Sequence, residues 1–74
     1  MGRQAKRPRK HEPYYAVKAY QMLYRLSNRD VADRLGMAER TYTDKVNGFS
    51  DFTATEAIKL SEVLQHAIDE IFLT

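Results

Sequence analysis

Two groups of side chains in this sequence could bind a partner through charge and hydrogen bonds. The first is a cluster near the N-terminus that holds five of the twelve basic residues: Arg3, Lys6, Arg7, Arg9 and Lys10. The second is a series of polar and charged residues between Asn28 and Asn47, whose amide, guanidinium, hydroxyl and carboxylate groups can hydrogen-bond to a ligand. Fixed positive charge attracts polyanions, so the first group favours an anionic partner.

The residue types give little support to catalysis. The two histidines, His11 and His66, have no third metal ligand at a suitable spacing, and no nucleophile is paired with a base. The chain contains no cysteine, which removes disulfides and thiolate zinc sites. We therefore expect no enzyme, no metal and no small-molecule cofactor.

Charge is divided unevenly along the chain. The net charge is only +2, yet residues 49–74 carry one base, Lys59, against five acids. A polyanion should therefore approach the N-terminal part, while the C-terminal part faces away from it. No apolar run reaches the roughly 18 residues of a membrane span, and the basic N-terminus lacks the apolar stretch of a secretory signal. We expect a small cytoplasmic domain without a membrane segment.

The apolar pattern predicts an all-α chain with a flexible basic arm at residues 1–13 and a folded domain at residues 14–74. Pro8 and Pro13 bracket the end of the arm. A first helix is expected over residues 14–25. One face of that helix carries its regularly spaced inner residues: Ala16, Ala19, Tyr20 and Leu23.

The next two predicted helices are short and joined by a tight turn. Ser27 is a suitable N-cap, with Asp30 three residues later, and Gly36 can take the left-handed conformation that ends a helix. A third helix is expected from about residue 39 to residue 46, ended by the Asn-Gly pair at 47–48. Two short helices around a single-glycine turn form the helix-turn-helix pattern, which leaves one face of the second helix able to enter the major groove of DNA.

Two further helices complete the predicted five-helix domain. Residues 53–56 fit a capping box, so a fourth helix should run to about Gln65, and a last turn or two covers residues 68–72. No segment alternates with period two for long enough to form a strand. All five helices contribute to the predicted core: Leu23, Val31, Ala32, Leu35, Tyr42, Val46, Ile58, Leu64 and Ile71.

Residues 31–48, VADRLGMAERTYTDKVNG, resemble the helix-turn-helix of the lambda repressor and Cro superfamily, also called the XRE type. The similarity extends over about residues 26–72. Residues 41–53, TYTDKVNGFSDFT, are also similar to small repressor-like proteins of Gram-positive phages. The resemblance implies a compact lambda-repressor-like fold and a sequence-specific regulator of transcription that binds duplex DNA, namely a phage or prophage repressor.

The resemblance also implies roles for single residues. Asn28 matches a position that bonds a phosphate, and Asn47 matches an asparagine that holds the DNA backbone on the far side of the groove. Glu39 and Arg40 match positions that reach base edges. Arg40 could pair with both acceptors of a guanine or be a solvated surface arginine. Glu39 could accept from a cytosine amine or stabilise the start of its helix.

Three residues continue the same helix. Thr43 and Asp44 share its exposed face, where Asp44 either contacts a base or disfavours wrong sequences. Lys45 stands where the family often has an apolar residue, so we expect its stem along the surface and its ammonium at a phosphate. Ala38 replaces the family's common serine cap, which weakens the start of the helix by about 1 kcal/mol.

The basic arm admits three interpretations: a solvated tail, a nuclear address or a DNA-binding arm. The lambda repressor also has a basic arm ahead of its first helix, so we expect DNA contacts from Lys6, Arg7 and Lys10. A stacking platform for single strands, built from the tyrosines of residues 14–24, is disfavoured because their helical spacing suits core and surface positions.

One short helix contacts too few base pairs for useful specificity, so we expect two copies on a pseudo-palindromic operator. A weak homodimer is predicted through the loop at Phe49 and four apolar residues near the C-terminus: Ile68, Ile71, Phe72 and Leu73. The competing hypothesis is a protein-interaction module of the same fold, such as an antitoxin or an accessory regulatory subunit.

Overall fold

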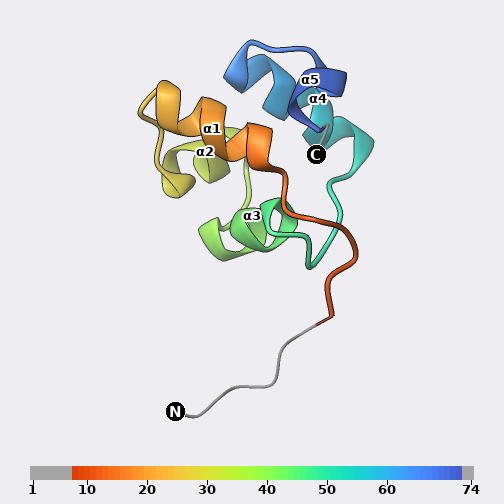
Figure 1. Cartoon of the computed structure of the whole chain (residues 1–74). Helices are drawn as coiled ribbons and strands as arrows, with labels where there is room; N and C mark the ends of the chain where they lie inside the picture. Colours follow the sequence, from red (N-terminus) through yellow and green to blue (C-terminus); the bar gives the residue numbers. More distant parts are fainter. Residues whose placement is uncertain (1–7, 73–74) are drawn as a thin grey trace.

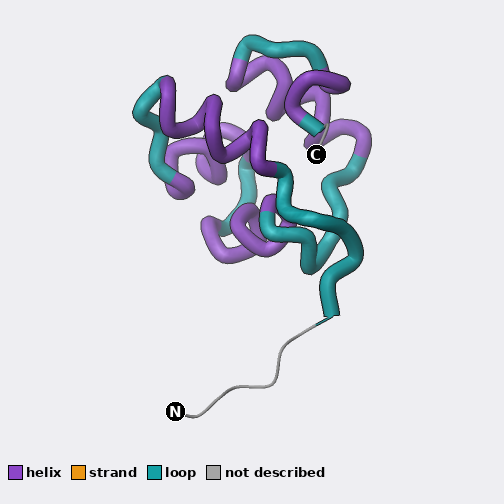
Figure 2. Tube along the Cα trace, in the orientation of Figure 1, coloured by secondary structure: helices purple, strands orange, loops and turns teal. Residues whose placement is uncertain are grey.

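A computed structural model of the chain describes residues 8–72, and these residues form five helices (Figures 1 and 2). Between residues 8 and 72 there is no strand, which confirms the predicted all-α fold class. None of the helices in this range is long and apolar enough to cross a membrane. The helices are α1 (Tyr15–Leu23), α2 (Asn28–Leu35), α3 (Glu39–Val46), α4 (Ala54–Leu64) and α5 (Ile68–Ile71).

Reciprocal capping boxes fix the starts of α2 and α4. The Ser27 hydroxyl accepts from the backbone N–H of Asp30 at 3.0 Å, and the Asp30 carboxylate accepts from the backbone N–H of Ser27 at 2.9 Å. Thr53 and Glu56 make the same pair of bonds, at 3.1 and 2.9 Å. The bonds from Ser27 hold the pKa of the Asp30 carboxyl below its ordinary value. Both helices thus begin where the sequence predicts.

The core lies where α2 packs against α3 and α4, and where α1 packs against α4 and α5. Ala32 is fully buried at the α2 side of this core, which leaves no room for a larger side chain. Seven of the nine predicted core residues are buried. The observed core consists of Val17, Val31, Ala32, Leu35, Tyr42, Val46, Leu60, Leu64 and Ile71.

Two of the predicted core residues are exposed, because Leu23 lies off the buried face of α1 and Ile58 lies off the buried face of α4. Leu23 is 66% exposed and Ile58 is 49% exposed, whereas Val17 and Leu60 are fully buried. Leu23 follows Val17 by six residues, and Ile58 precedes Leu60 by two, so each lies well around the helix from the buried position. Helix α1 also ends at Leu23 rather than at residue 25.

The segment before α1 is docked on the domain. The backbone N–H of Lys10 donates to the carbonyl of Gly48 at 2.6 Å, and that of Tyr14 donates to the carbonyl of Val46 at 2.9 Å. Pro13 is buried. Residues 10–13 of the predicted arm lie along the end of α3 (Figure 1). Lys6 and Arg7 lie outside the described residues.

Two glycines have positive φ angles for different reasons. Gly36, at the end of α2, has φ +74°, and a Cβ there would meet no atom within 4 Å. Gly48 has φ +98°, and a Cβ there would overlap the backbone carbonyl of His11. Gly36 is thus required by backbone conformation alone, whereas Gly48 is also required by the close approach of the N-terminal segment.

Replacing each glycine by alanine separates these two requirements. Gly36→Ala should lower the free energy of unfolding by about 1 kcal/mol, the cost of a left-handed alanine. Gly48→Ala should cost clearly more, because the docked segment must also move away. Urea unfolding of the two variants beside the wild type tests this. Equal losses would show that the contact between Gly48 and His11 contributes nothing.

Candidate nucleic-acid interface

The turn between α2 and α3 sets the direction of α3. The backbone N–H of Gly36 donates to Asp33 at 3.1 Å, and that of Met37 donates to Ala32 at 3.0 Å, which closes the end of α2. The side chain of Met37 packs against the core. Helix α3 then begins at Glu39, and the preceding residue, Ala38, has no side chain that could cap it. These bonds join α2 to α3 through a tight turn.

One face of α3 is buried and the other is open. Tyr42 and Val46 are buried, whereas Glu39 and Arg40 are exposed at the N-terminal end of the helix. The hydroxyl of Thr43 donates to the backbone carbonyl of Arg40 at 3.0 Å and so is held against its own helix. The charged pair at the start of α3 is therefore presented to solvent one turn before the partly buried Thr43.

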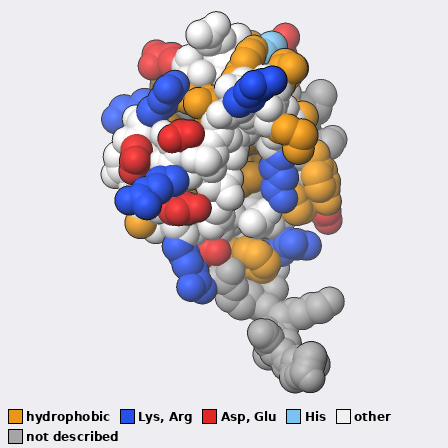
Figure 3. All heavy atoms as spheres, turned by 90° about the vertical axis from the view of Figure 1, so that its left-hand side faces the viewer, with side chains coloured by type: hydrophobic (Ala, Val, Ile, Leu, Met, Phe, Trp, Pro, Cys, Tyr) orange, Lys and Arg blue, Asp and Glu red, His pale blue; other side chains and the backbone are white. Residues whose placement is uncertain are grey.

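The molecular face that is turned to the left in Figure 1 carries basic and acidic side chains side by side, not a uniform basic surface (Figure 3). Interspersed charge of this kind attracts a polyanion weakly over distance. Recognition of a polyanion would then depend on where individual hydrogen-bond donors lie around α3.

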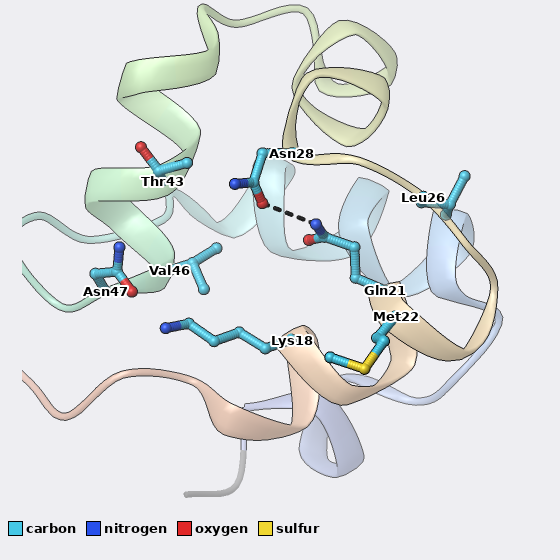
Figure 4. Close-up of a pocket in the computed structure, with 8 residues that line it drawn as sticks. All are labelled: Lys18, Gln21, Met22, Leu26, Asn28, Thr43, Val46 and Asn47. Atoms are coloured by element: carbon cyan, nitrogen blue, oxygen red, sulfur yellow. Dashed lines mark hydrogen bonds between the residues drawn. The ribbon is translucent and has the colours of Figure 1, made fainter.

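A cavity of about 410 Å³ lies between α1 and α3 (Figure 4). It brings together three of the predicted contact residues, Asn28, Thr43 and Asn47. Lys18 extends from α1 toward Asn47 across the opening (Figure 4). The lining residues are Lys18, Gln21, Met22, Leu26, Asn28, Thr43, Val46 and Asn47.

A chain of hydrogen bonds orients the amide of Asn28. The buried Tyr42 hydroxyl donates to the side-chain oxygen of Gln21 at 2.7 Å, and the Gln21 amide donates to the side-chain oxygen of Asn28 at 2.8 Å. The Tyr42 hydroxyl is protonated at neutral pH and can donate, and burial raises its pKa further. The amide nitrogen of Asn28 is consequently turned toward Thr43 (Figure 4).

The cavity therefore presents hydrogen-bond donors: the amide nitrogen of Asn28 and the ammonium of Lys18, with the amide of Asn47 beside it (Figure 4). A donor-rich opening suits an anionic oxygen, such as that of a phosphate. Sequence reasoning missed Lys18 and Gln21. No local signal marks them, because only the packing of α1 decides that Val17 and Gln21 lie on its inner face.

Lys45 is directed away from this cavity. Its ammonium lies 2.6 Å from a carboxylate oxygen of Glu56 and 5.9 Å from the ring centre of Phe52, and its side chain is only 13% exposed. The expected phosphate contact is thus replaced, in the protein alone, by an ion pair. Because Glu56 also accepts from Thr53 at the start of α4, Lys45 joins the last turn of α3 to α4.

The remaining predicted contacts lie around the C-terminal half of α3. Asp44 is partly exposed on that helix. Lys10 is exposed beside Gly48, just beyond the end of the helix, and the Arg9 guanidinium lies 5.1 Å from the ring centre of Phe49. Within residues 8–72, no three His, Cys, Asp or Glu side chains are grouped to hold a metal ion.

Comparison with solved structures finds several chains of the same fold, among them one from Listeria innocua and one from Neisseria. A transcriptional regulator from Listeria innocua superposes with a TM-score of 0.73 over 85% of this chain, at 21% identity. The hypothetical transcription factor NHTF from Neisseria superposes with a TM-score of 0.73 over 95% of this chain, at 14% identity. This chain spans 59% of the Listeria chain and 85% of the Neisseria chain.

No family model matches the sequence, and no curated protein matches it either. Both structural neighbours are described as transcription regulators rather than enzymes. The class defined here is therefore an all-helical fold that proteins described as transcriptional regulators also have.

The ion pair between Lys45 and Glu56 predicts a pH dependence of stability. The bond from Lys45, followed by that from the Thr53 backbone, holds the pKa of the Glu56 carboxyl below its ordinary value. A lowered carboxyl pKa stabilises the fold at neutral pH, and this contribution is lost as the pH falls through the lowered value. Lys45→Met should therefore be less stable at neutral pH and lose less stability on acidification.

Urea unfolding at neutral pH and at several values below about pH 4, the ordinary glutamate range, measures both effects. Lys59→Met, which removes an exposed lysine from α4, is the matched control. If both variants follow the same pH profile, the ion pair does not join α3 to α4.

Proposed function

We propose that this protein is a sequence-specific transcriptional regulator of the lambda repressor and Cro type, which binds duplex DNA with α3 in the major groove. The observation that carries this proposal is the α2–turn–α3 unit, which buries Tyr42 and Val46 and leaves Glu39 and Arg40 in solvent. The transcription regulators that share the fold support it.

The dimensions of α3 suit this role. An α-helix with its side chains is about 10–12 Å in diameter and so fits the major groove, which is about 12 Å wide. Arg40 would pair with the acceptors of a guanine, and Glu39 would accept from a cytosine amine. Thr43 and Asp44 follow one turn later. Backbone phosphates would meet the donors of the cavity beside α3: Lys18, Asn28 and Asn47.

Repression is the outcome we propose, because occupation of an operator excludes other proteins without any further contact. The resemblance to small phage proteins supports a phage or prophage origin. Lys45 is left out of the proposed contacts because its ammonium is held by Glu56.

The proposed operator is pseudo-palindromic, with half-sites about 34 Å apart, because two copies of so short a helix are needed for specificity. Fewer of the apolar residues predicted for a weak dimer interface are exposed than the sequence suggests. Ile71 is fully buried, and Phe72 packs edge-on against Tyr14 at 4.8 Å. Ile68 remains 42% exposed beside an apolar cavity of about 370 Å³, whereas Leu73 lies outside the described residues.

A second candidate function is supported by α1, where Met22 is 79% and Leu23 is 66% exposed. Large apolar side chains in solvent favour a protein partner, as in an antitoxin or an accessory subunit. Salt separates the two functions. Duplex binding through phosphates weakens steeply as salt is added, whereas an apolar protein interface responds little.

Arg40→Ala should relax sequence preference at one position of each half-site, at a cost of about 1 to 3 kcal/mol there. Selection from a random duplex pool provides the operator, and affinities for its single-base variants provide the measurement. Lys59→Ala, on α4, should leave all of these affinities unchanged. A loss for Arg40→Ala that is equal on every sequence would make Arg40 a phosphate contact.

Ile68→Asp should abolish cooperative occupation of two half-sites and leave the affinity for one half-site intact, because Ile68 is only partly packed on its own domain. Leu23→Asp is the matched control, since it places the same charge on an exposed apolar position of α1. Footprinting on a single half-site and on the full palindrome measures both. Equal affinity per wild-type protomer on the two DNAs would contradict the dimer.

A further inference from the structure

The segment that precedes α1 is bonded to the end of the proposed recognition helix. The backbone N–H groups of Lys10 and His11 point to the carbonyl of Gly48, at 2.6 and 3.3 Å. The backbone N–H of Tyr14 donates to Val46, the last residue of α3. The basic arm therefore starts from a fixed place beside α3 and not from the start of α1.

His11 holds this segment through its side chain. The ring stacks on Tyr14 with 4.2 Å between centroids, and only 18% of the side chain is exposed. One ring nitrogen lies 2.7 Å from the carbonyl of Glu12, and the other lies 3.1 Å from the carbonyl of Ser50. The carboxylate of Asp51 is 3.7 Å from the same nitrogen. His11 thus connects the arm, α1 and the loop after α3.

The path of the segment is constrained on both sides of His11. On one side, the backbone carbonyl of His11 packs so closely on Gly48 that a Cβ atom at position 48 would overlap this carbonyl. On the other side, Pro13 is buried and restricts the backbone before α1. Toward the N-terminus, the Arg9 guanidinium lies over the ring of Phe49 at 5.1 Å. Residues 9–13 are therefore held along one route.

We propose that His11 is a positioning residue for DNA binding, which fixes Lys10 beside Gly48 and Arg9 beside Phe49 so that they meet the same stretch of phosphate backbone as the end of α3. This inference rests on the proposed function. An arm whose base is fixed in the protein alone loses less conformational freedom when it binds. His11 would act through the two basic residues and touch no nucleotide itself.

Two variants test the role of the ring. His11→Ala removes all of its contacts, and His11→Phe retains an aromatic ring to stack on Tyr14 but has no N–H to donate to Glu12 or Ser50. Both should lower affinity for the selected operator by about tenfold, roughly the cost of ordering one residue of backbone. The preferred sequence should not change. The slope of log affinity against log salt concentration should flatten by up to about 2, one unit for each of the basic residues Arg9 and Lys10.

A double-mutant cycle separates positioning from general stability. The same His11 substitutions are made in an Arg9→Ala/Lys10→Ala background. Urea unfolding, carried out at the temperature of the binding assay, checks that every variant is folded there. If His11 acts through the two basic residues, its substitution should cost no further affinity in that background. An equal loss in both backgrounds, or unchanged affinity of the single variants, would overturn the inference.

The outcome for the wild type distinguishes this inference from the proposed function. A wild-type chain that shows no salt-dependent binding to duplex DNA overturns both. A wild type that binds, with His11 variants that bind equally well, overturns only the positioning role.

Discussion

The burial of Tyr42 is the constraint on which the rest of the structure depends. Its ring lies in the core near Phe52, and a phenol removed from water must find a hydrogen-bond partner. Gln21 supplies that partner from α1. The requirement to satisfy one buried hydroxyl therefore links the packing of α3 to the orientation of Asn28 at the start of α2, so that stability and site geometry share the same bonds.

The two ends of α3 are held very differently. At the C-terminal end, Lys45 is paired with Glu56 and the N-terminal segment is bonded to Val46 and Gly48. At the other end, Ala38 offers no side-chain cap, and the exposed Glu39 and Arg40 follow at once. In the proposed complex with DNA, the fixed C-terminal end would hold α3 in place on a phosphate backbone, and its uncapped first turn would meet the base edges.

Much of the fold could be predicted because its signals are local. The capping boxes at Ser27 and Thr53 and the left-handed Gly36 fix helix ends through bonds within a few residues, and the structure has these ends as predicted. The inner faces of α1 and α4 were harder to assign. Each helix carries apolar residues on more than one side, as Leu23 and Ile58 show, and only packing against neighbours decides which side is buried.

The sequence by itself determined that two short helices, α2 and α3, follow each other around Gly36, because this glycine, the cap at Ser27 and the four-residue spacing of Tyr42 and Val46 act over short stretches of chain. Only the tertiary structure decided that Gln21 orients Asn28, that Lys45 turns to Glu56, and that His11 docks the arm against Ser50. The two residues of each contact are separated in the sequence by 7, 11 and 39 positions, respectively. Such meetings depend on how helices cross and loops return, and no local pattern in the chain encodes them.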